Sequence, residues 1–211
     1  MTSFDELLGR AEALAARGGR AILGITGAPA AGKTTLARGI ADALGTRATV
    51  VGMDAFHLAQ VELRRLGRIE RKGAPDTFDA YGYVSLLRRL KEGKETVYAP
   101  EFRREIEEPI AGAVPVGADV PLVITEGNYL LLESEPWSDV RGLLDEVWFL
   151  APDEQERIER LATRHRRYGR TLVEARQRAL GSDQRNADLI QPTAARADLV
   201  LENLPLANFA I

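Results

Sequence analysis

The chain has 211 residues, a net charge of −3 and 45% hydrophobic residues, which suits one α/β domain spanning residues 1–211. The acidic balance argues against bulk binding of nucleic acid. Cysteine is absent, which excludes disulfides and thiolate chemistry and fits a cytoplasmic protein. Since no apolar run approaches the ~18 residues that span a membrane, we expect neither a membrane nor a nucleic acid as partner.

Local patterns predict strands and helices that alternate along the chain. A capping box at residues 3–6 opens a first helix, which ends at the glycine pair 18–19. Apolar runs and amphipathic segments then predict strands at 21–25, 48–51, 121–125, 146–150 and 197–201 and helices at 35–44, 61–66, 83–90, 152–168, 175–180 and 183–190. Between the helix at 83–90 and the strand at 121–125, three prolines interrupt the pattern. They predict a hairpin-like excursion at about 94–118.

This alternation predicts a central, mainly parallel sheet with helices on both faces, a three-layer α/β/α fold. Ligands of such sheets bind beyond the carboxyl ends of the strands. We therefore look for functional residues directly after predicted strands.

The segment 27–34 reads Gly-Ala-Pro-Ala-Ala-Gly-Lys-Thr and connects a predicted strand to a predicted helix. This spacing is typical of the phosphate loop of P-loop NTPases, in which backbone N–H groups and the helix N-terminus bind phosphates. Lys33 would reach the β- and γ-phosphates, and the Thr34 hydroxyl would hold Mg²⁺. We expect the nucleotide contacts to come from Gly27, Ala28, Ala30, Ala31, Gly32, Lys33, Thr34 and Thr35.

Several acids follow predicted strands. Asp54 comes after the strand 48–51 and could accept a proton from an acceptor hydroxyl, although a turn aspartate is an equal alternative. Glu126 ends the strand 121–125 and could complete the Mg²⁺ environment, with a surface glutamate as the alternative. We expect Asp79 to cap a helix, whereas Asp76 either caps or holds substrate hydroxyls.

Two rings could form part of an acceptor pocket. His57 follows Asp54 closely, and Phe102 lies in the excursion. Plain packing is the alternative for both residues. A histidine base is unnecessary where Asp54 and Mg²⁺ chemistry are available.

Six arginines lie between residues 157 and 170. A solvated charged face is the usual origin of such a run, and a nucleic-acid patch is disfavoured by the acidic balance. A third interpretation is a lid at about 160–182 that closes over the triphosphate and neutralises charge during transfer. We assign this role to Arg164 and Arg170, and we treat Arg166 and Arg167 as surface residues.

Taken together, these segments resemble the uridine kinase, pantothenate kinase and phosphoribulokinase superfamily over residues 20–201. Residues 53–57 resemble its Asp-x-Phe/Tyr segment, which implies that Asp54 is the catalytic base. Residues 125–129 resemble its Glu-Gly strand end, which implies a magnesium ligand at Glu126. The resemblance also implies an arginine-bearing lid at residues 164–170.

Other correspondences concern the two substrates. Residues 75–79 resemble a segment whose first aspartate contacts ribose in uridine kinases, which implies a substrate contact for Asp76. Asn186 stands near a position that flanks adenine in some members. Phe102 matches an aromatic residue in the hairpin by which uridine kinases recognise the pyrimidine. Arg103, however, stands where uridine kinases have an aspartate. The sequences of residues 54–57 and 99–102 most resemble those of a bacterial subgroup described as nucleoside/nucleotide kinase-like or as fructose-transport-system kinases.

We therefore expect an ATP- and Mg²⁺-dependent kinase that phosphorylates an alcohol of a small molecule. Nucleosides, sugars and pantothenate-like alcohols all remain open as acceptors. The alternative is a P-loop ATP-binding regulatory protein without an acceptor. A GTPase is disfavoured because the sequence lacks an Asn-Lys-x-Asp segment. Relatives are commonly dimers, and a homodimer remains open.

Overall fold

The computed structural model describes residues 2–169 and 171–204. Its central sheet has the strand order β2-β5-β1-β6-β7, and every neighbouring pair is parallel. This confirms the predicted parallel sheet. The strands are β1 (Ala21–Gly27), β2 (Ala48–Gly52), β5 (Leu122–Gly127), β6 (Glu146–Ala151) and β7 (Leu199–Glu202).

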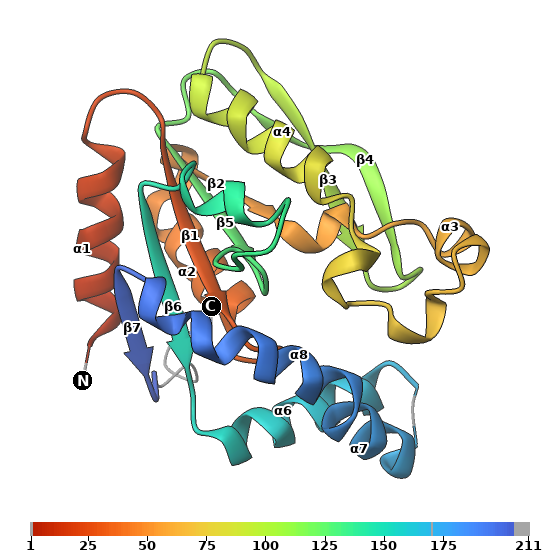
Figure 1. Cartoon of the computed structure of the whole chain (residues 1–211). Helices are drawn as coiled ribbons and strands as arrows, with labels where there is room; N and C mark the ends of the chain where they lie inside the picture. Colours follow the sequence, from red (N-terminus) through yellow and green to blue (C-terminus); the bar gives the residue numbers. More distant parts are fainter. Residues whose placement is uncertain (1, 170, 205–211) are drawn as a thin grey trace.

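Helices cover the sheet on both faces, as predicted (Figure 1). On one face, α1 (Phe4–Ala15) and α2 (Lys33–Leu44) pack with alternate strand residues such as Leu23 and Ile124. On the other face, α4 (Ala80–Glu92) packs with the intervening residues, such as Val123. This alternation places one apolar layer on each side of the sheet. A short helix, α5 (Ser138–Arg141), joins the second layer.

The predicted excursion is an antiparallel hairpin of β3 (Val97–Arg103) and β4 (Glu108–Val116), with a register shift between Ala99 and Glu101. Its base is held by Arg20, whose guanidinium donates to the carbonyls of Leu90, Gly117 and Val120. The hairpin is thereby anchored beside the sheet. Short helices precede it: η2 (Met53–Phe56), α3 (Gln60–Arg65), η3 (Ile69–Arg71) and η4 (Pro75–Thr77).

The C-terminal part contributes three consecutive helices, α6 (Glu154–Arg167), α7 (Leu172–Leu180) and α8 (Ser182–Ile190). They lie together beyond the strand ends, across from the hairpin (Figure 1). α7 begins three residues before the predicted start because Thr171 and Glu174 form a capping box. None of the helices in the described part of the chain has the length and apolarity needed to cross a membrane.

Candidate active site

The segment 27–34 forms a tight loop between the end of β1 and the start of α2. Gly27 has φ 144°, and a Cβ there would lie 2.6 Å from the carbonyl oxygen of Leu150. Gly32 has φ 100°, and even Ala30 adopts a left-handed φ of 65°. Because side chains disfavour these conformations, the two glycines are required for this loop.

Lys33 is buried and folds back over the loop. Its ammonium group donates to the carbonyls of Gly27 and Ala28, each at 2.9 Å. Burial lowers the pKa of Lys33 to about 8, although the carboxylates of Glu126 and Asp54 act in the opposite direction. A triphosphate would therefore meet a lysine that is already held at the loop and is partly deprotonated above neutral pH.

Glu126 lies at the end of β5, beside the loop. Its carboxylate accepts a hydrogen bond of 3.0 Å from the Thr34 hydroxyl. Burial and the charge of Asp54 raise the pKa of Glu126, whereas Lys33 lowers it. The close approach of η2 depends on Gly127, since a Cβ there would lie 2.4 Å from Cβ of Met53. Gly127 thus lets the segment that carries Asp54 pack against the strand that carries Glu126.

Asp54 is paired with an arginine from the hairpin. Arg104 Nη2 donates to Asp54 Oδ2 at 3.0 Å. Burial alone would raise the pKa of Asp54, but the charges of His57, Arg104 and Lys33 outweigh burial and lower it. Asp54 is therefore ionised near neutral pH and can accept a proton.

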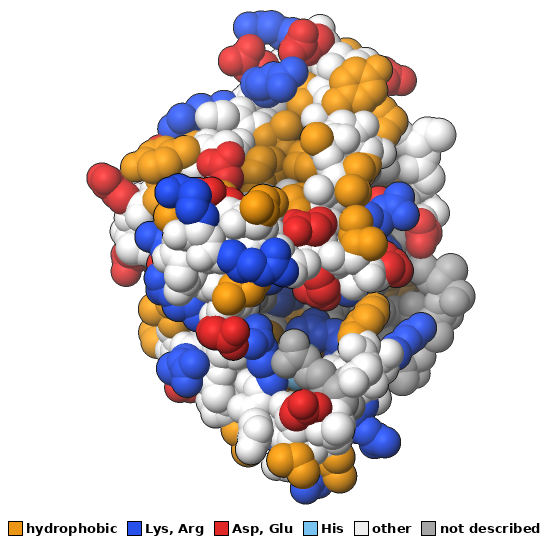
Figure 2. All heavy atoms as spheres, turned by 90° about the vertical axis from the view of Figure 1, so that its right-hand side faces the viewer, with side chains coloured by type: hydrophobic (Ala, Val, Ile, Leu, Met, Phe, Trp, Pro, Cys, Tyr) orange, Lys and Arg blue, Asp and Glu red, His pale blue; other side chains and the backbone are white. Residues whose placement is uncertain are grey.

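Two adjoining cavities share Asp54. The loop cavity has a volume of about 770 Å³ and includes Lys33, Thr34, Thr35 and Glu126 in its lining. The hairpin cavity has a volume of about 530 Å³ and includes His57, Lys72 and Asn186. Arg104, Arg164 and Phe102 line both cavities as well. Figure 2 shows Lys and Arg side chains gathered in a hollow on this face.

His57 and Phe102 line the hairpin cavity together. The His57 ring lies between the rings of Phe78 and Phe102, with centroids 4.0 and 5.0 Å away. Its Nδ1 donates to the carbonyl of Asp54 at 2.7 Å. Burial lowers the pKa of His57 despite the nearby Asp54. A hydrogen-bonded ring in this position supports the loop that carries Asp54.

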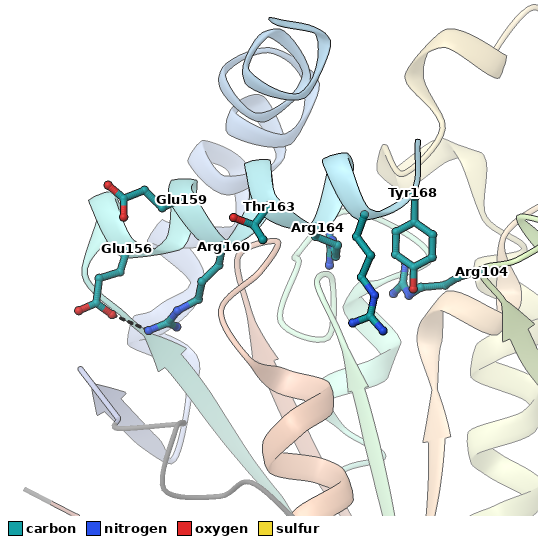
Figure 3. Close-up of a pocket in the computed structure, with 8 residues that line it drawn as sticks. Arg104, Glu156, Glu159, Arg160, Thr163, Arg164 and Tyr168 are labelled. Carbon is teal, nitrogen blue, oxygen red and sulfur yellow. Dashed lines mark hydrogen bonds and ion pairs between the residues drawn. The ribbon is translucent and has the colours of Figure 1, made fainter. Parts of the chain in front are cut away.

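Helix α6 presents its arginines to the loop cavity. Arg160, Arg164 and Arg167 line this cavity and a further depression of about 650 Å³. Figure 3 shows Arg164 and Tyr168 near Arg104, while Arg160 pairs with Glu156. Burial lowers the pKa of Arg164, and the charge of Arg104 lowers it further. The structure thus gathers two arginines from different elements around Asp54.

Three assigned residues lie differently from the expectation. Asp76 pairs with Arg71 at 2.6 Å and Arg68 at 3.5 Å, and it lines neither cavity that contains Asp54, so its position does not support a substrate contact. Asn186 donates to Gly73 in the hairpin cavity and does not line the loop cavity, which speaks against an adenine contact. Arg167 is exposed but lines the loop cavity, so it is more than a surface residue.

Arg170 lies outside the described residues. Two other arginines were missed by the sequence interpretation. Arg104 carries no local signal, because its partner Asp54 lies 50 positions away. Arg157 belongs to the basic run, yet its side chain is buried. Its position four residues before Leu161, on the same face of α6, was the available signal, but this spacing could not identify the partner.

The oxygen donors fit a magnesium ion. Mg²⁺ is usually bound through one or two carboxylates together with substrate phosphates and water. The Thr34 hydroxyl and the Glu126 carboxylate supply such donors beside the loop. In the described part of the chain, no group of three or more His, Cys, Asp or Glu residues could hold a metal ion alone.

A family model and a curated relative match the chain over nearly its whole length, and a second relative matches about half of it. The family model described as "Phosphoribulokinase / Uridine kinase family" matches residues 22–210. A "putative uridine kinase" of Schizosaccharomyces pombe is 34% identical over 218 residues, which cover 98% of this chain and 93% of that protein. A pantothenate kinase of Bacillus velezensis is 34% identical over 115 residues, which cover 52% of this chain and 36% of that protein.

A solved structure shows a similar fold. The crystal structure of a "putative fructose transport system kinase" from Silicibacter sp. TM1040 superimposes with a TM-score of 0.85 and 36% sequence identity. The match covers 95% of this chain and 100% of that one. The similarity therefore spans the loop, the hairpin and the three C-terminal helices.

Proposed function

We propose, from the premise that the chain belongs to the phosphoribulokinase/uridine kinase family and is a phosphotransferase with an alcohol acceptor, that it transfers the γ-phosphoryl group of ATP to a small molecule in the hairpin cavity. One observation carries this assignment. Asp54 lines both the loop cavity and the hairpin cavity. A carboxylate at this junction is where an acceptor hydroxyl would meet the γ-phosphate.

The loop cavity is the site for the triphosphate. The backbone of the loop and the N-terminus of α2 would bind the phosphates, as their geometry favours anions. The Lys33 ammonium would exchange the carbonyls of Gly27 and Ala28 for phosphate oxygens. Thr34 and Glu126 would hold Mg²⁺, which neutralises charge on the phosphates when it is bound.

Asp54 would act as the base. Its carboxylate takes the proton of the acceptor hydroxyl as the hydroxyl oxygen forms a bond to the γ-phosphorus. The bond between that phosphorus and the bridging oxygen breaks, and its electron pair leaves with ADP. The lowered pKa of Asp54 keeps the carboxylate ionised for this step.

The arginines around the junction would stabilise the transferring charge. Arg164 lines both cavities and approaches from α6, and Arg104 approaches from the hairpin. Positive groups held in place at the point where charge develops lower the barrier of phosphoryl transfer. Closing α6 toward the hairpin would also exclude water from the reacting atoms.

A screen of ATP consumption tests the function. The panel contains nucleosides, hexoses, pentoses and pantothenate, and the phosphorylated product is measured along with ADP. Lys33→Ala serves as the background control. We expect at least one alcohol to stimulate ATP turnover well above the background and to appear as a phosphate ester. Slow ATP hydrolysis that no alcohol stimulates would instead indicate a regulatory ATP-binding protein.

A further inference from the structure

The aromatic rings of the hairpin cavity are already in contact with protein side chains. The His57 ring contacts both Phe78 and Phe102. In addition, Lys72 Nζ lies 5.0 Å and Arg104 Cζ lies 5.7 Å from the centroid of the Phe102 ring.

Two cations lie over the Phe102 ring. The side chain of Lys72 is only 11% exposed, so its charge is largely removed from water. Arg104 lines the same cavity. A cation in such a position gains from an anionic partner, and a charged group held over a ring retains its attraction to anions.

The backbone that carries Lys72 is held in place by several elements. Arg178 of α7 donates to the carbonyl of Lys72 at 3.2 Å. Asn186 of α8 donates to the carbonyl of Gly73 at 3.2 Å, and the Tyr129 hydroxyl donates to the same oxygen. Lys72 is therefore presented to the cavity from a preorganised position, which reduces the entropic cost of binding a ligand.

Both cations have protein partners that a ligand can replace. Lys72 Nζ donates to the backbone carbonyl of Glu107, and the carboxylate of the same residue lies 3.6 Å from Nζ on a side chain that is 52% exposed. Glu107 sits in the hairpin turn with φ 55°, so this long ion pair is made by a strained turn residue. The partner of Arg104 is Asp54, which must be free to accept the proton of the acceptor.

The remaining charged residues of the hairpin cavity leave Lys72 and Arg104 available to an anion. Asp183 is paired with His165 at 2.7 Å. Glu70 and Glu105 also line the cavity and are at its exposed side, whereas Arg164 and Arg178 add positive charge. An anion at Lys72 and Arg104 thus meets two cations whose present partners are a turn residue and the base.

We propose, resting on the kinase function above, that the acceptor is a small acidic alcohol, whose carboxylate or phosphate group binds to Lys72 and Arg104 in the hairpin cavity. Binding of this group draws Arg104 away from Asp54. Asp54 then becomes available to the hydroxyl of the same molecule. A neutral alcohol leaves Arg104 on Asp54, so the anionic group contributes to turnover as well as to affinity.

Matched pairs of acceptors test the proposal. Pantothenate is compared with pantothenol, and fructose 1-phosphate with fructose, so that the two arms distinguish a carboxylate from a phosphate. We expect the acidic member of at least one pair to have a kcat/KM about 10- to 100-fold higher, the effect of one hydrogen bond to a charged group. Lys72→Met should remove this preference by weakening only the acidic acceptor.

Two further variants provide controls. Glu107→Gln removes the competing carboxylate, so it should lower KM for the acidic acceptor more than for the neutral one. This variant is exposed and remains informative if Lys72→Met fails to fold. Lys94→Met, at an exposed lysine that pairs with Glu92, should change neither acceptor. A neutral alcohol that is phosphorylated as well as its acidic partner would leave the kinase function intact and overturn this inference.

If no acceptor is phosphorylated, a binding experiment tests the anion subsite separately from the kinase function. The protein is then loaded with Mg²⁺ and a non-hydrolysable ATP analogue, and inorganic phosphate is titrated while the melting temperature is followed. Stabilisation by phosphate that Lys72→Met abolishes would support the anion subsite while counting against the kinase function. No stabilisation in the unaltered protein would overturn the anion subsite.

Discussion

The guanidinium group of Arg157 donates to the carbonyl of Pro29 at 3.2 Å, which fastens α6 to the phosphate loop. Arg157 is only 1% exposed, and its other nitrogens bind Glu154 and Gln184. The contact joins residues 128 positions apart in the chain. The loop therefore depends on α6 for its shape as well as on its own glycines.

Replacement of Arg157 by methionine should damage the loop more than the chemistry. The buried carbonyl of Pro29 would lose its partner, which costs about 1–3 kcal/mol of folding free energy. We expect a lower free energy of unfolding in urea and a KM for ATP that rises more than kcat falls. Arg166→Met, at an exposed position of the same helix, is the matched control. An unchanged KM for ATP would show that Arg157 does not position the loop.

The affinity for ATP should weaken at alkaline pH. The pKa of Lys33 lies at about 8 because of burial, and only the protonated form attracts phosphate. Below this pH the ammonium is charged and binding is strongest. Above it the Kd for ATP should rise about tenfold per pH unit. Isothermal titration between pH 6.5 and 9.5 measures this, with Lys33→Arg, which stays charged, as a flat control. A flat profile in the unaltered protein would contradict the assignment of Lys33.

The packing at Gly127 should be essential for placing Asp54. A Cβ in Gly127→Ala would meet Cβ of Met53 at 2.4 Å, so η2 must shift. We expect kcat to fall at least about tenfold, since small displacements of a base are costly. Gly142→Ala is the control, because its nearest neighbouring atom would lie 3.9 Å away. Steady-state kinetics that show equal kcat for both variants would argue against this positioning.

Magnesium should act through Thr34 and Glu126. Glu126→Gln removes a charged oxygen donor, so a higher Mg²⁺ concentration should be needed for half-maximal activity. Thr34→Ser retains the hydroxyl and should behave like the unaltered protein, whereas chelation by EDTA should abolish transfer. Activity titrated against free Mg²⁺ gives the comparison. Equal Mg²⁺ requirements in the unaltered protein and Glu126→Gln would exclude Glu126 as a ligand.

Local patterns predicted most of the fold and indicated the residues of the proposed phosphate site. The loop at 27–34, Asp54 shortly after β2 and Glu126 at the end of β5 could be recognised because glycine spacing and apolar runs are short-range signals. The capping box at Thr171 was also present in the sequence and would have corrected the start of α7. Such features need only a few neighbouring residues.

The remaining parts of the site depend on long-range contacts. Arg104 reaches Asp54 across 50 positions, so the arginine-rich hairpin could not show which residue would enter the site. Asp76 appeared suited to substrate hydroxyls, but Arg68 and Arg71 fold back onto it. Which charge pairs with which is a property of the packed chain, and a single sequence does not contain it locally.

The central claim is that Asp54 is the base at the junction of two cavities. Asp54→Asn keeps the size of the side chain and removes the proton acceptor. With the best acceptor from the screen, we predict that kcat falls about 10²- to 10⁴-fold while the Kd for ATP changes by less than about threefold. Asp139→Asn, an exposed aspartate that pairs with Arg88, is the matched control. Turnover by Asp54→Asn at the rate of the unaltered protein would contradict the account.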